Sequence, residues 1–156
     1  MSSPTPRTQG LKGPALSASR AKEYERCPYQ YRLHVVDKIS DPPSKATALG
    51  TLVHSVLERL YDLPFKERSV EAAIGLLEKE WDAKKVSSPE VLFVFETPEE
   101  EGPWFESARK IVTAYFSIED PQWLAPAARE QLVDAVTVDG IRLRGFIDRI
   151  DRSAAG

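Results

Sequence analysis

The stretch EQLVDAVTVDGIRLRGFIDRID, residues 130–151, decides which fold this sequence can adopt. It contains two runs in which apolar and polar residues alternate, and the pair Asp139-Gly140 separates them. Alternation with a period of two is typical of a β-strand, and an Asp-Gly pair is typical of the tight turn of a hairpin. The sequence therefore predicts a β-hairpin over residues 131–150.

One acidic residue, Asp148, stands in the apolar second run of this hairpin. With a period of two, it shares a face with Phe146 and Ile150. Ile147 and Arg149 point to the other face. An ionised carboxylate among apolar neighbours is costly unless a positive group meets it. The pattern therefore raises the question of which positive partner Asp148 has.

Most of the chain before the hairpin shows the periodicity of amphipathic helices. A first helix is predicted over residues 46–61, with a buried stripe of Leu49, Leu52, Val53, Val56, Leu57 and Leu60. A second begins near Ser69, and its buried face is Val70, Ala73, Ile74, Leu77 and Trp81. A third runs from about Trp104 to Ile118, after an interruption at Gly102-Pro103, and buries Ala108, Ile111, Val112, Tyr115 and Phe116.

The N-terminal part of the chain divides into a tail and two short helices. Residues 1–16 are rich in Pro, Ser, Thr and Gly, which predicts a flexible tail. Ser17 is a suitable N-cap for a helix over ASRAKEYER, residues 18–26. Pro28 ends that helix and begins another over residues 28–36, because proline is tolerated in the first turn of a helix.

Together these patterns predict an α+β fold in which N-terminal helices are followed by a β-hairpin. A hairpin of two strands is only marginally stable in water, so we expect its sheet to need strands that this sequence does not contain. The run VLFVF, residues 91–95, fits either a short strand or an apolar anchor within a long loop.

The composition argues against a membrane-spanning or exported protein. No stretch of the 156 residues approaches the roughly 18 consecutive apolar residues of a membrane span, and the N-terminus lacks the apolar core of a signal peptide. The single cysteine cannot form an internal disulfide, which favours the cytoplasm. Residues 1–60 hold nine Lys and Arg against five Asp and Glu. This excess of positive charge either binds the phosphates of a nucleic acid or belongs to an ordinary solvated surface.

His54 lies off the apolar stripe of the first long helix. It shares a flank with Gly50, one turn earlier, and with Glu58 and Tyr61. A glycine leaves room for a backbone or a ligand to approach closely, which is compatible with a binding site around His54. The other interpretation is a surface histidine whose neighbour at i+4 is Glu58.

The segment CPYQYRL, residues 27–33, leaves two interpretations open as well. Cys27 is either a buried small apolar residue or a ligand of a metal cluster. The neighbouring tyrosines and arginines either stack bases and hold phosphates, or pack helices while the arginines face water; they are Tyr24, Tyr29, Tyr31, Arg26 and Arg32.

Taken in order, three segments of the chain resemble the RecB-like branch of the PD-(D/E)xK nuclease superfamily. They are LSASRAKEYERCPYQYRL at residues 16–33, GTLVHSVLE at residues 50–58 and LRGFIDRID at residues 143–151. Each motif is weak alone, whereas their order and spacing make the combination specific. The resemblance implies a nuclease domain over residues 17–156. Its helices and hairpin would be an incomplete part of a restriction-endonuclease-like α/β core.

The resemblance implies a role for particular residues. His54 matches the histidine of a GxxxH helix, Asp148 matches the aspartate of a GxxDRxD strand, and Glu130 is a weaker candidate for an assisting acidic position. These side chains would bind Mg²⁺ or Mn²⁺, and the cation would be the positive partner of Asp148. The substrate would be DNA, hydrolysed in the manner of an exonuclease during repair or recombination. A helicase is the implied partner, and the residues expected to contact DNA are Arg20, Arg26, Tyr31 and Arg32.

Two parts of the family pattern are missing. Only RSAAG follows Asp151, and the D/E-x-K strand that carries the family's lysine does not appear there. Many relatives also hold a 4Fe-4S cluster with one cysteine in the position of Cys27 and three more near the C-terminus, which this sequence lacks. We therefore expect a fragment of a larger nuclease, inactive by itself. The alternative is a non-catalytic α+β module that binds nucleic acid or another protein.

Overall fold

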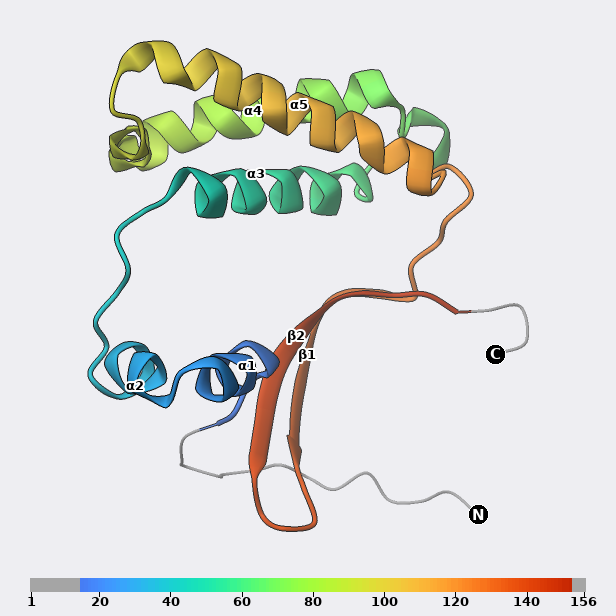
Figure 1. The fold of residues 1–156 in the computed structure, drawn as a ribbon. Coiled ribbons are helices and arrows are strands. Elements are labelled where there is room, and N and C mark those ends of the chain that lie inside the picture. The colour runs from blue at the N-terminus through green and yellow to red at the C-terminus, as the bar shows by residue number, and fades with distance from the viewer. Residues whose placement is uncertain (1–14, 153–156) are drawn as a thin grey trace, which may run out of the picture. The chain divides into compact units, whose positions relative to one another are not determined.

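In the computed structural model, residues 15–152 are described, and they fold into helices followed by a β-hairpin (Figure 1). The chain divides into two compact units, which are described separately. One is formed by residues before Pro42 together with those from Pro126 onward, and the other spans residues 42–125. The elements are α1 (Ala18–Arg26), α2 (Pro28–Tyr31), η1 (Arg32–Val36), α3 (Lys45–Leu60), η2 (Phe65–Glu67), α4 (Val70–Ser87), η3 (Pro89–Val94), η4 (Pro98–Glu100), α5 (Glu101–Ile118), β1 (Ala128–Val136) and β2 (Arg142–Ile150).

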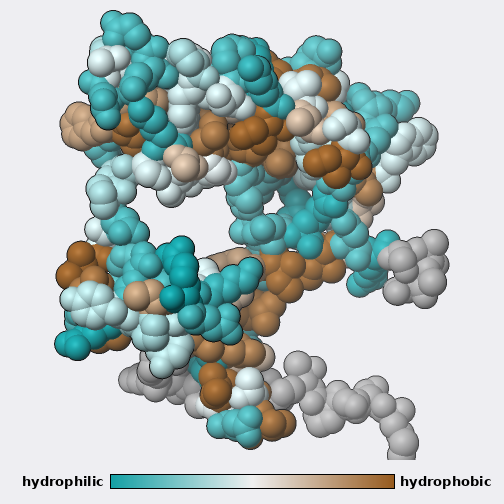
Figure 2. All heavy atoms as spheres, in the orientation of Figure 1, coloured by the Kyte–Doolittle hydropathy of each residue, from teal (hydrophilic) through white to brown (hydrophobic). Residues whose placement is uncertain are grey.

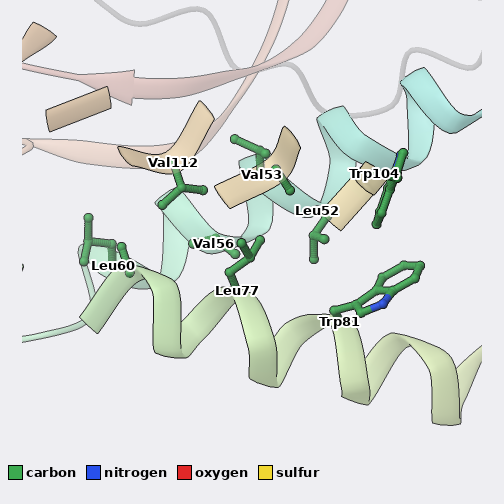
Figure 3. Close-up of a cluster of buried hydrophobic side chains, with 10 residues drawn as sticks. Leu52, Val53, Val56, Leu60, Leu77, Trp81, Trp104 and Val112 are labelled. Atoms are coloured by element: carbon green, nitrogen blue, oxygen red, sulfur yellow. The ribbon is translucent and has the colours of Figure 1, made fainter. Parts of the chain in front are cut away.

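The helical unit is built from α3, α4 and α5, whose apolar faces meet in a single core (Figures 1 and 3). The sequence periodicity correctly predicts most of this core, because residues three and four apart lie on one helix face. Trp81 and Trp104 stack with ring centroids 4.7 Å apart. The buried core residues are Leu52, Val53, Val56, Leu60, Ala73, Leu77, Trp81, Trp104, Ala108 and Val112.

Serine caps start two of these helices. The Ser44 hydroxyl accepts a hydrogen bond from the Thr47 amide at 3.1 Å, and the Ser69 hydroxyl accepts one from the Ala72 amide at 3.2 Å. Each satisfies an amide that the first turn of a helix would leave without a partner. The predicted helix starts near residues 46 and 69 are therefore confirmed.

Two expectations for α5 are wrong. The Gly102-Pro103 pair does not interrupt the helix, which begins at Glu101. Pro103 lies in the first turn, where an amide has no partner within the helix, so its missing N–H removes no bond. Ile111 was expected in the core but is 45% exposed, because Ala108 and Val112 form the centre of the contact and Ile111 lies beside it.

The run of residues 91–95 is not a strand. It forms the 3₁₀ helix η3 and the residue that follows it, and its side chains anchor this segment to the core. Val91, Leu92 and Phe95 are half-buried there, and the Phe95 ring stands edge-on to Trp104 with centroids 5.4 Å apart. Of the two interpretations that the sequence allowed, the apolar anchor is correct.

The other unit contains α1, α2, η1 and the hairpin. Ser17 caps α1 as predicted, with its hydroxyl accepting from the Arg20 amide at 3.3 Å. Cys27 is extended and separates α1 from α2, and the chain stays helical from Pro28 through Val36. Residues 1–14 of the predicted tail lie outside the described residues.

The predicted hairpin is present and antiparallel, and its register places Val136 opposite Arg142 at the turn and Ala128 opposite Ile150 at the open end. Gly140 has φ +82°, a conformation that glycine adopts without strain. Leu16 forms a parallel bridge with Leu143 of β2. The amide of Leu16 donates to the Arg142 carbonyl at 2.9 Å, and its carbonyl accepts from the Arg144 amide at 3.0 Å.

Apolar side chains remain exposed on both faces of the hairpin. Phe146 is 63% exposed, and hydrophobic residues are visible on the surface along the strands (Figure 2). A sheet of two strands has too few neighbours to cover such side chains. Among residues 15–152, no helix combines the length and the hydrophobicity that a membrane span requires.

Candidate metal centre

Two acidic residues face each other across the hairpin. Arg129 pairs with Arg149 and Gln131 pairs with Ile147, so Glu130 and Asp148 occupy opposing positions between these pairs. A carboxylate oxygen of Glu130 lies within 4.8 Å of one of Asp148. The hairpin thus brings together two of the residues that the sequence nominates for metal binding.

The backbone at Glu130 is unusual. Its φ is +46°, in the left-handed region that a residue with a Cβ rarely adopts, and the regular pairing of the strands is interrupted there. Such a conformation costs about 1–3 kcal/mol and is found mostly where the surrounding structure imposes it, often at functional sites. The strain falls on the residue that turns a second carboxylate toward Asp148.

Asp148 is exposed, whereas the sequence predicted a carboxylate surrounded by apolar side chains. The sequence placed it on a face with Phe146 and Ile150, and we expected its charge to be costly among apolar side chains. Water reaches the carboxylate in the structure, so that cost is reduced. Glu130 places a second carboxylate near Asp148, and a cation bound between the two would reduce their mutual repulsion.

Compared with known protein families, residues 15–156 match the PD-(D/E)XK nuclease superfamily. The chain belongs to this superfamily. Comparison with curated proteins and with solved structures found no similar protein. Membership implies metal-dependent nuclease activity on DNA, and PD-(D/E)XK nucleases generally use Mg²⁺ or Mn²⁺.

The hairpin pair suits the metals that PD-(D/E)XK nucleases use. Mg²⁺ binds oxygen ligands and keeps several waters, so one or two protein carboxylates are enough to hold it. Carboxylates also suit Mn²⁺, which in addition accepts imidazole more readily than Mg²⁺ does. The donor set at Glu130 and Asp148 therefore fits either ion.

His54 belongs to the helical unit, on α3. It is exposed while its neighbours Leu52, Val53 and Val56 are buried, so the sequence correctly separated it from the apolar stripe. A Cβ added to Gly50 would meet no atom within 4 Å, which leaves open space one turn before His54. Tyr61, which the sequence placed on the same flank, is instead buried, and its hydroxyl lies 2.6 Å from that of Tyr115.

Cys27 is half-buried at the junction of α1 and α2, and its thiol is free. Tyr31 is half-buried against Tyr24, with ring centroids 5.4 Å apart and an edge-on arrangement. Within this unit Tyr31 therefore contributes to helix contacts, whereas Tyr24 and Tyr29 are 55% and 69% exposed.

The three arginines proposed to contact DNA lie on the surface of the same unit. Arg20 donates to the Ala15 carbonyl at 2.9 Å, Arg26 donates to the Gln30 side chain at 2.8 Å, and Arg32 lies 3.6 Å from an Asp37 oxygen. Each is exposed and could exchange these weak surface contacts for a phosphate.

His34 stands in no motif that sequence analysis singles out, yet it joins two carboxylates. Its Nδ1 bonds to Glu23 of α1 and its Nε2 lies 3.2 Å from Asp41, at the end of this unit. Both ring nitrogens must carry hydrogen to donate to both acceptors, which is the protonated form. Accordingly, the hydrogen bond to Glu23 raises the pKa of His34 above its ordinary value of 6.5. Burial opposes this increase with a smaller effect, and the charge of Asp41 adds a further, still smaller increase.

This contact predicts that the α1–η1 pair is more stable in acid than in base. Because the folded pKa of His34 is raised, its stabilising contribution is complete below about pH 6.5. That contribution is lost as the pH rises through the folded pKa. Hydrogen exchange of residues 18–36, corrected for intrinsic rates, should be faster at pH 9 than at pH 6. In His34→Gln the difference should disappear, and an unchanged difference would exclude His34 as its source.

Proposed function

We propose that this chain carries the metal-binding half of a DNA nuclease of the RecB-like branch, with Asp148, Glu130 and His54 as the metal ligands. The observation that carries the proposal is the pair of carboxylates facing across the hairpin of a PD-(D/E)XK chain. Placing His54 in the same site is part of the proposal. It rests on the position of this histidine in the GxxxH segment, on the exposed side of α3.

Each side chain has a distinct role in this proposal. The carboxylates of Asp148 and Glu130 hold the cation and offset its charge, and the imidazole of His54 supplies a neutral ligand from the helical unit. When bound, a divalent cation polarises the scissile phosphate and lowers the pKa of a water molecule that attacks it. The lysine of a D/E-x-K strand, which residues 1–156 do not include, would orient that water and balance developing charge.

DNA would be held by the unit that contains the hairpin. Arg20, Arg26 and Arg32 are exposed on α1, α2 and η1, and such cations bind phosphates without regard to sequence. Tyr31 is half-buried against Tyr24, so its part would be to support the more exposed tyrosines.

Cys27 would be one of four ligands of a 4Fe-4S cluster, together with three cysteines that residues 1–156 lack. We further propose that the enzyme acts as an exonuclease in DNA repair or recombination. Its partner would be a helicase, and its location would be the cytoplasm.

The site is tested by measuring how Mn²⁺ binds to the 156-residue chain. We expect Asp148→Asn to weaken Mn²⁺ binding at least about tenfold, because a neutral amide replaces a charged ligand. Electron paramagnetic resonance of free Mn²⁺ gives the affinity directly and needs no catalytic activity.

Asp139→Asn is the matched control for this experiment. It removes the same charge from the same hairpin, and Asn-Gly is as favourable as Asp-Gly in the turn. The control should bind Mn²⁺ as the unsubstituted chain does. Equal affinity in Asp148→Asn and Asp139→Asn would show that Asp148 is an ordinary strand residue, and the proposed site would then be wrong.

A further inference from the structure

The most buried charged side chain in the described part of the molecule is Arg68, which is 7% exposed. It lies just after η2, in the segment that joins α3 to α4. Its guanidinium lies over the rings of Tyr61 and Phe65, with 4.9 Å and 4.5 Å to their centroids. A buried cation is expensive unless its donors are satisfied, so its hydrogen bonds identify its role.

Arg68 makes four hydrogen bonds, and every acceptor is a backbone carbonyl. Its Nε donates to Leu63 at 2.9 Å and its Nη2 donates to Tyr61 at 3.1 Å, both just after the last residue of α3. Its Nη1 donates to Pro121 at 3.2 Å and to Leu124 at 2.8 Å, both in the segment after α5. Pro121 is itself fully buried. Arg68 therefore binds the end of α3 to the segment that leads from α5 to β1.

These contacts connect two parts of the chain that the proposed metal site needs. His54 precedes Tyr61 by seven residues of α3, which is about 10 Å along the helix. Glu130 follows Leu124 by six residues, so it can lie at most about 20 Å from the point that Arg68 holds. Only five residues thus separate Leu124, the last residue that Arg68 holds, from Glu130, the first hairpin ligand.

We propose that Arg68 is a positioning residue for the metal site: it fixes the point at which the chain leaves the helical unit and so limits where Glu130 and Asp148 can meet His54. This inference rests on the proposed function. Its chemical requirement is specific, because the planar guanidinium directs donors to four carbonyls at once, whereas a lysine ammonium is a single point with three donors.

Two substitutions and one control test the role of Arg68. Arg68→Met keeps much of the length of the side chain and removes its hydrogen-bond donors. Arg68→Lys keeps the positive charge but loses the planar arrangement of donors that the guanidinium provides. Leu77→Ala, in the core of the helical unit and away from these hydrogen bonds, controls for lost stability. Mn²⁺ affinity is measured by electron paramagnetic resonance, well below the midpoint of thermal unfolding of each variant. Helix content by circular dichroism shows that each chain is folded.

We expect Arg68→Met and Arg68→Lys to bind Mn²⁺ at least about tenfold more weakly, while Leu77→Ala binds it normally despite a similar or larger loss of thermal stability. The inference would be overturned if Mn²⁺ affinity decreased in proportion to thermal stability in all three variants. It would also be overturned if Mn²⁺ affinity were unchanged in both Arg68 variants.

Hydrogen exchange of residues 121–136 separates this inference from the proposed function. We expect faster exchange there in the Arg68 variants and not in Leu77→Ala, whether or not metal is present. If the unsubstituted chain bound no Mn²⁺, the proposed site would fail. Hydrogen exchange would then show only whether Arg68 holds residues 121–124 in place. The claim that Arg68 positions metal ligands would be wrong together with the proposed site. Unchanged exchange in the Arg68 variants would overturn the inference even if Mn²⁺ bound normally.

Discussion

Asp148→Asn should lower DNA cleavage by at least about two orders of magnitude in a chain that includes the D/E-x-K strand. The substitution keeps the size of the side chain but removes the charge that holds the cation, and the chemical step depends on that cation. DNA affinity should change little, because binding rests mainly on Lys and Arg contacts with phosphates. Cleavage is measured with Mg²⁺ and with Mn²⁺, and DNA affinity at two salt concentrations.

Arg26→Ala and Arg32→Ala should show the opposite pattern. Each should weaken DNA binding, and each lost phosphate contact should reduce the salt dependence of binding by about one unit of slope. Metal affinity should be unaffected. Residues 1–156 alone should cleave little or no DNA, since they contain no D/E-x-K strand. If Asp148→Asn cleaved DNA at nearly the normal rate, this carboxylate would have no catalytic part.

The helices and the hairpin could be predicted because their signals are local. The apolar stripe of α3 repeats every 3.6 residues, and Asp139-Gly140 marks the turn between two alternating runs. Residues 91–95 could not be assigned in advance, because a short apolar run has no period long enough to distinguish a strand from a turn of helix. Pro103 was misjudged since its effect depends on its distance from the helix start.

The candidate site was predictable in its residue types and less so in its geometry. His54 and Asp148 stand in motifs that a sequence can show, whereas the left-handed backbone of Glu130 has no signature in a residue other than glycine. Arg68 was missed for a related reason. Its partners are carbonyl groups, which every residue carries, and two of them lie 53 and 56 positions away. Side-chain patterns contain no information about such contacts.

Leu77→Ala should produce the largest loss of stability among the substitutions considered. Leu77 is fully buried on α4, within the core shared with α3 and α5 (Figure 3). Removing its side chain leaves a cavity, and such changes cost about 2–5 kcal/mol in free energy of unfolding. For a unit of this size, about 3 kcal/mol corresponds to a decrease in Tm of roughly 10–25 °C.

Tryptophan fluorescence is the appropriate probe, because all three tryptophans lie within residues 42–125. Trp81 and Trp104 are buried in the core beside Leu77, so their emission reports unfolding of the helical unit and not of the hairpin. The control is Val86→Ala on the same helix. Val86 is 83% exposed, and its truncation should change the free energy of unfolding by no more than about 0.5 kcal/mol. A similar small effect in Leu77→Ala would mean that α4 does not contribute to a close-packed core.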